Sequence, residues 1–267
     1  MKKRHMLWID GCLAGFLGLM LLVWAPPVSA EWYAAGYGGT STSGSFGNTE
    51  MNQLGRRQAL AQFPNANDPA AASLTQSYKT SDIDLKNSTI LGGKVGYFFT
   101  DEKLSWLGLE LEAFSSKPSI KTQTLDYEQT ISYKPTTVPN PCTGLPNPTC
   151  PITVTNRGQL PLSESSLRVS TVALNLIARY PGQVFQPYAG VGVGAFYFSS
   201  SKGSIQGRQF TPGLNLLTGV KVLVTDEWGF FAEGKYNLAN VSSFDPTFGL
   251  SGTYSIFHLI GGVAYHF

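Results

Sequence analysis

The feature that most limits how this chain can fold is a period-two alternation that recurs in eight segments. In a β-strand, successive side chains point to opposite faces, so residues i and i+2 share a face. The segments are residues 31–40, 89–100, 105–115, 167–180, 185–198, 210–224, 228–240 and 253–267. Each has at least the roughly 9–11 residues that a tilted strand needs to cross a bilayer. The pattern predicts an all-β protein.

The residue types on the two faces of these segments distinguish a membrane barrel from a soluble barrel. One series is apolar or aromatic, from Tyr33, Ala35 and Tyr37 at its start to Phe257 and Phe267 at its end. The opposite series carries polar and charged residues, which are Lys94, Glu110, Glu112, Asn175, Arg179, Lys221, Glu233 and Lys235. A soluble up-and-down barrel needs apolar residues inside. The alternation therefore predicts an outer wall that faces lipid and a polar interior.

The connections between the segments indicate the topology. The tight polar turns DEKL, PGQV and TDEW join segments two to three, four to five and six to seven. The alternate connections are longer, and residues 41–88 and 116–166 are predicted to be long extracellular loops. Short turns on one rim and long loops on the other are typical of outer-membrane barrels. We therefore expect an eight-stranded antiparallel up-and-down transmembrane β-barrel over residues 31–267.

Residues 1–30 have the layout of a signal peptide. A basic head at residues 2–4 precedes an apolar run, and Val28-Ser29-Ala30 is a small-residue cleavage site, so Glu31 is the predicted first residue of the mature chain. Removing three basic residues and one acidic residue from 19 and 17 leaves 16 of each. A neutral chain has no basic excess of the kind that nucleic-acid binding requires.

The interior charges have a structural and a catalytic interpretation. Buried charges must be paired or solvated, so we expect Lys94 and either Lys221 or Lys235 to meet Glu110, Glu112 and Glu233 in a network. Two carboxylates at i and i+2, as in Glu110 and Glu112, also suit general acid–base chemistry. An eight-stranded barrel is filled by its own side chains and has no cleft for a substrate. The structural interpretation is therefore favoured.

The cysteines that remain after residue 30 are Cys142 and Cys150, in the stretch CTGLPNPTC. An exported chain meets an oxidising compartment, so these two are candidates for a disulfide that closes a small proline-rich loop. A zinc site would need more ligands than two cysteines and two distant histidines supply. No metal and no cofactor is predicted.

Four stretches make the chain resemble a known family: EWYAAGYGG, FQPYAGVGVGAFYF, TGVKVLVTDEWGFFAEGKY and GGVAYHF. They are similar to the small outer-membrane β-barrel proteins of Gram-negative bacteria, the OmpA-like transmembrane domain superfamily, also called the porin family. The resemblance implies that Val263, Tyr265 and Phe267 form the signal read by the barrel-assembly machinery. It also implies contact with outer-membrane lipid and lipopolysaccharide.

Three functions remain open from the sequence. The first is a non-enzymatic barrel that anchors surface loops for envelope integrity or for contact with an extracellular ligand. The second is a narrow passive channel for small solutes. The third is a lipid A-modifying enzyme, which needs a serine and a histidine close together near the outer leaflet. His258 is predicted to point inward and Ser255 lies on the opposite face, so the third is the least supported.

Overall fold

The computed structural model describes residues 31–63, 69–99, 103–134 and 151–267, and its architecture is all-β. Eight antiparallel strands form the barrel wall. They are β1 (Glu31–Met51), β4 (Ser88–Phe98), β5 (Leu107–Ser116), β8 (Arg168–Arg179), β9 (Phe185–Ser200), β10 (Gly207–Leu223), β11 (Trp228–Val241) and β12 (Leu250–His266). None of the helices within the described residues is long and apolar enough to cross a membrane.

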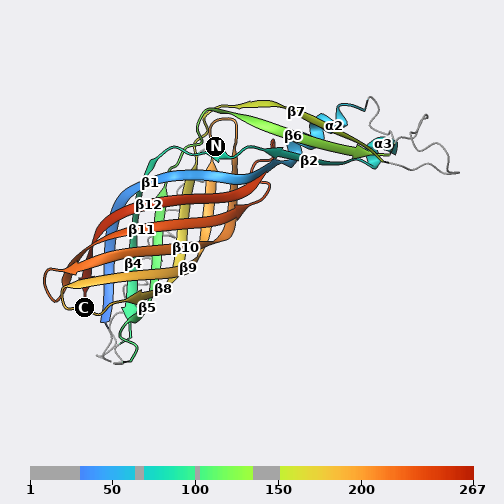
Figure 1. Cartoon of the computed structure of the whole chain (residues 1–267). Coiled ribbons are helices and arrows are strands. Elements are labelled where there is room, and N and C mark those ends of the chain that lie inside the picture. The colour runs from blue at the N-terminus through green and yellow to red at the C-terminus, as the bar shows by residue number, and fades with distance from the viewer. Residues whose placement is uncertain (1–30, 64–68, 100–102, 135–150) are drawn as a thin grey trace, which may run out of the picture.

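The barrel closes between its first and last strands (Figure 1). Each wall strand pairs with the next one along the chain, and β12 returns to pair with β1, from Tyr33 opposite His266 to Met51 opposite Leu250. Closure gives every wall strand a hydrogen-bonding partner on both sides, which removes the open edges of the sheet. The predicted eight-stranded antiparallel up-and-down barrel is confirmed.

The outer wall of the barrel is apolar, as the alternation predicted. On β8, for example, Val172, Leu174 and Leu176 are about half exposed, whereas Ala173 and Asn175 between them are buried. We call the end of the barrel with the short turns the turn rim and the opposite end the loop rim. Aromatic pairs encircle the turn rim, with Trp32 next to Tyr97 and Trp228 next to Tyr265, at ring-centroid distances of 5.1 and 4.9 Å. Such girdles occur at membrane interfaces.

The first strand differs from the prediction. Tyr33 and Tyr37 were expected to face outward, but they are only 4% and 7% exposed and point into the barrel. Their rings lie over Gly96 and Gly92 of β4, where there is no room for a Cβ atom. The prediction was wrong because the other face of this strand carries only alanine and glycine between Trp32 and Thr40, so apolar contrast could not identify the inner face. Counting tyrosine as an apolar residue ignored its hydroxyl group, which needs a partner when buried.

An arm extends beyond the loop rim (Figure 1). It consists of β2 (Thr75–Thr80), β6 (Gln123–Tyr133) and β7 (Ile152–Leu162), with the helices α2 (Asn52–Leu60) and α3 (Pro69–Ala72). β6 pairs with β2 on one side and β7 on the other, and β2 meets the end of β1 through Lys79 opposite Glu50. The short strand β3 (Ile83–Asp84) also pairs with β1.

The arm corrects the prediction that residues 41–88 and 116–166 are loops. β1 continues past residue 40 to Met51, and the later region contains the β6–β7 hairpin. These stretches are rich in Thr and Ser, which suit an exposed strand face as well as a loop. One face of the arm is packed, since Ile131 is fully buried and Tyr78 stacks on Tyr127 at 4.8 Å. Packing of this kind cannot be seen in a polar composition.

Candidate functional site

The middle of the barrel holds a network of buried charges. Lys94 on β4 lies between two carboxylates, with its Nζ atom 2.6 Å from Glu233 on β11 and 3.2 Å from Glu110 on β5. The hydroxyl of Tyr33 donates to Glu110 at 2.5 Å, and that of Tyr188 donates to Glu233 at 2.8 Å. All three charged side chains are at most 3% exposed. The strand alternation therefore brings opposite charges together from distant parts of the sequence.

A second buried ion pair adjoins the first. Lys235 on β11 contacts Glu112 on β5, and the hydroxyl of Tyr37 also donates to this carboxylate. The ammonium of Lys235 lies 3.4 Å from Glu233, which links the two pairs into one network. The carboxylates thus receive charged and neutral donors together, as buried anions require.

A ladder of amides completes the network. Asn237 donates to Asn215 and Asn215 donates to Asn175, both at 2.8 Å, and Asn175 donates to Glu110 at 2.9 Å. Sequence reasoning missed Asn215 and Asn237, although each shares a strand face with the charged residues of its own strand. It also missed the tyrosines of β1, which the glycines at alternate positions of β4 would have indicated.

Arg179 and Lys221 lie apart from this network, near the turn rim. Arg179 forms a two-pronged pair with Glu31, and its guanidinium stacks 3.7 Å from the ring centroid of Phe98. His266 contacts the same carboxylate at 2.9 Å and lies 3.2 Å from the ammonium of Lys221. Of the two lysines predicted as alternatives, the structure therefore places Lys235, and not Lys221, against the central glutamates.

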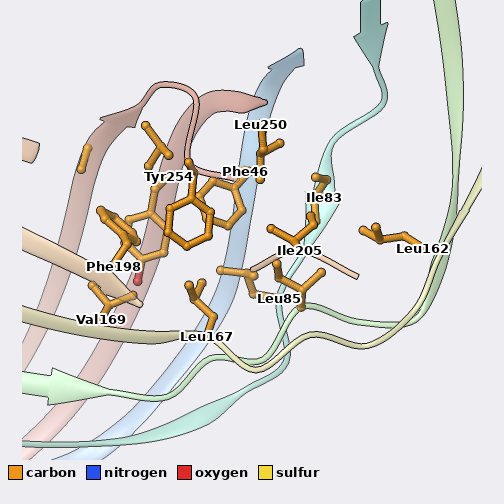
Figure 2. Close-up of a cluster of buried hydrophobic side chains, with 14 of the residues drawn as sticks. Phe46, Ile83, Leu85, Leu162, Leu167, Val169, Phe198, Ile205, Leu250 and Tyr254 are labelled. Carbon is orange, nitrogen blue, oxygen red and sulfur yellow. The ribbon is translucent and has the colours of Figure 1, made fainter. Parts of the chain in front are cut away.

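Between the network and the loop rim the interior is apolar (Figure 2). Tyr254 of β12 packs against Phe198 of β9 at 5.0 Å and against Phe46 of β1 at 5.6 Å between ring centroids. We call this cluster the aromatic plug; its members are Phe46, Phe196, Phe198, Phe244 and Tyr254, all at most 3% exposed. The same core continues through Leu85 and Ile83 into the base of the arm. The plug therefore closes the loop rim and joins it to the arm.

A serine and a histidine meet inside the wall. The Oγ atom of Ser41 lies 2.7 Å from Nδ1 of His258, and both residues are at most 1% exposed. Ser255 instead contacts Ser45 on the other face. The Nε2 atom of His258 has no hydrogen-bond partner among the described residues, so no carboxylate orients the ring there. A sealed pair of this kind offers no access to a lipid ester.

The interior beside the charge network has little free space. A cavity of about 10 Å³ lies beside Lys94 and Glu110, which is room for about one water molecule. No group of three or more His, Cys, Asp or Glu side chains within the described ranges is placed to hold a metal ion. The carboxylates are matched by cations and amides, which is the arrangement expected of a structural network.

Two predicted features, the disulfide and the signal cleavage site, lie outside the described residues, and a third, the assembly signal, remains a prediction. Cys142, Cys150 and the cleavage site after Ala30 lie outside the described residues. Val263 and Phe267 face outward at the turn rim, 37% and 50% exposed, in line with the aromatic girdle. Their role in assembly stays a prediction.

The sequence profile of the outer membrane protein beta-barrel domain matches residues 15–267. No curated protein matches the sequence significantly. Among solved structures, Neisserial surface protein A is 14% identical, with 90% of this chain and 99% of its own covered and a TM-score of 0.43. Ail of Yersinia pestis, solved with the heparin analogue sucrose octasulfate, is 11% identical, with 89% and 98% covered and a TM-score of 0.37. OprG from Pseudomonas aeruginosa is 12% identical, with 89% and 95% covered and a TM-score of 0.39.

The family match includes every strand of the barrel wall. The wall itself has the features that an outer-membrane barrel needs, which are an apolar exterior, an aromatic girdle, short turns at one rim and a polar interior. The chain therefore belongs to the outer membrane protein beta-barrel domain family.

Proposed function

We propose that this protein is a closed, non-enzymatic outer-membrane barrel that anchors its arm outside the cell for contacts with surface or envelope components. The filled lumen is the observation that carries the proposal. The ion network fills the middle of the barrel, and the aromatic plug fills the part below the loop rim. A barrel filled in this way holds the arm in place and leaves no continuous water path for solutes.

Single-channel recording tests this proposal against a passive channel. Purified protein refolded into planar bilayers is expected to show no steady conductance, because ions would have to cross both the buried network and the plug. A gel-shift on heating must show that the same sample is folded, and a wide porin in the same bilayer serves as the positive control. Steady ion-selective current from folded protein would contradict the proposal and make Lys94, Glu110, Glu112 and Glu233 the selectivity residues.

Two properties of the arm support a role in contacts. Its outward sheet face is polar, with Lys79, Glu128 and Arg157 side by side across three strands. The next rows toward the arm's tip carry hydroxyl groups, from Thr75, Ser77, Thr130, Ser132, Thr153 and Thr155. Within the described residues, β7 pairs only with β6, so its other edge presents unpaired backbone groups. Extended partners bind to such edges by adding a strand.

Cysteine labelling on intact cells tests the orientation. In a background without the native cysteines at 142 and 150, Thr155→Cys on β7 is expected to react with a membrane-impermeant maleimide. Asp226→Cys, in an exposed turn at the turn rim, is the matched control and is expected to react only after lysis. The mass of the labelled protein also tests the proposed export signal, since it should begin at Glu31. Reversed labelling, or retention of residues 1–30, would refute the corresponding part of the proposal.

A further inference from the structure

The outer wall carries a groove near the loop rim that the proposed function does not use. It has a volume of about 450 Å³ and lies over β4, β5, β8, β9 and β10. This volume is within the range of small-molecule sites, roughly 300–1,000 Å³. The groove opens on the lipid side of the wall, and its lining is mainly apolar.

The strand register explains why the wall is hollow at this place. Leu91, Ser115, Ser170, Tyr197 and Phe210 are successive cross-strand partners in one row. The large side chains stand at the two ends of the row and the serines lie between them. The two serine hydroxyls are 3.1 Å apart and bond to each other, which leaves one proton and spare lone pairs for a ligand.

A row of cations lies directly beyond the groove, toward the loop rim. Arg168 is opposite Ser199, and Ser199 is opposite Arg208, so the two arginines flank one strand on the outward face. Lys117 follows the end of β5 at the same level. We call these three exposed residues the basic belt. In the part of the chain that the structure describes, none of them forms an ion pair with an acidic side chain.

The height of the basic belt on the wall places it at the membrane surface. Tyr180, which directly follows β8 at the turn rim, is ten positions along the chain from Ser170 in the groove. At the usual rise and tilt of barrel strands this separation is roughly 25 Å along the membrane normal, the height of the apolar band of such barrels. The belt, one row further out, is therefore at the level of lipid headgroups. Because the long connections of these barrels are extracellular, this is the outer leaflet.

We propose that the groove and the basic belt together bind one phosphorylated, multiply acylated glycolipid of the outer leaflet. Its phosphates pair with Arg168, Arg208 and Lys117, and one acyl chain lies in the groove against Tyr197 and Phe210. Arginine forks match phosphate oxygens in a bidentate manner, and three adjacent cations suit a ligand with more than one phosphate. The site rests on the outer-membrane placement of the barrel and is independent of the closed lumen.

Native mass spectrometry of the refolded full chain in neutral detergent tests the site, with bisphosphorylated lipid A as the titrant. One bound molecule per barrel is expected. The double variant Arg168→Ala/Arg208→Ala should weaken the apparent affinity at least about tenfold, because two charge-assisted contacts are lost. The matched control Arg56→Ala/Lys134→Ala removes the same charge from exposed positions of the arm and should bind as the wild type does.

A second pair of variants tests the groove itself. Ala195→Phe fills the hollow and should weaken binding, whereas Ala232→Phe, on the lipid-facing side of β11, should not. Both changes are on the outer wall, and a gel-shift on heating confirms that each barrel is folded. Equal binding by the arginine variant and its control would overturn the proposal, as would equal binding by the two phenylalanine variants. Phosphatidylglycerol binding as tightly as lipid A, or displacement of lipid A by inorganic phosphate alone, would overturn the assignment to a glycolipid.

Discussion

Replacing Lys235 with methionine is expected to destabilise the barrel by about 3–5 kcal/mol, the usual effect of removing one partner from a buried ion pair. The methionine side chain fills nearly the same space, so the loss comes from charge and not from a cavity. Glu112 would lose its ammonium partner while it stays fully buried, and Glu233 would keep Lys94 as its one ammonium partner among the described residues, beside the Tyr188 hydroxyl. Urea unfolding in lipid vesicles, followed by tryptophan fluorescence, measures the difference.

Two further variants separate this effect from a general loss of charge. Lys121→Met breaks an exposed pair with Asp84, whose side chains are 46% and 61% exposed, and should cost less than about 1 kcal/mol. Adding Glu112→Gln to Lys235→Met removes the orphaned charge and should recover part of the lost stability. If the double variant is less stable than Lys235→Met alone, the unpaired carboxylate is not the cause.

Replacing Phe198 with alanine should destabilise the barrel by about 3–5 kcal/mol, because the ring is fully buried in the aromatic plug and its loss leaves a cavity. Phe198 contacts Phe46, Phe196, Phe244 and Tyr254, so four aromatic residues lose a packing partner at once. The plug also joins the barrel to the arm. We therefore expect faster hydrogen exchange at the base of the arm as well as a lower unfolding midpoint.

Phe230 is the matched control for Phe198. It is also a phenylalanine on a wall strand, but it faces lipid and is 57% exposed. Lipid fills the space left by Phe230→Ala, so this variant should lose far less stability than Phe198→Ala. Equal losses for the two variants would show that the plug is not a packed core.

The alternation of the sequence determined most of the barrel. Seven of the eight predicted segments coincide with wall strands to within three residues at either end, because lipid on one side and a polar lumen on the other impose opposite chemistry on successive residues. The inward direction of Lys94, Glu110, Glu112, Glu233 and Lys235 follows from the same constraint. The inward direction of the buried tyrosines of β1 was missed because, after Glu31, neither face of residues 32–40 carries a charge.

Tertiary structure alone decided which inward residues meet and what the long connections become. The alternation of side chains along each strand predicts that Lys221 and Lys235 point inward. Their heights in the lumen depend on the tilt and stagger of the strands. The closed barrel places Lys235 beside Glu112 and sets Lys221 near His266 at the turn rim. The arm forms because α2 packs against β2, and β2 pairs with β6 of the β6–β7 hairpin, although each segment looks polar alone. Both outcomes depend on contacts between residues far apart in the chain, which no local pattern encodes.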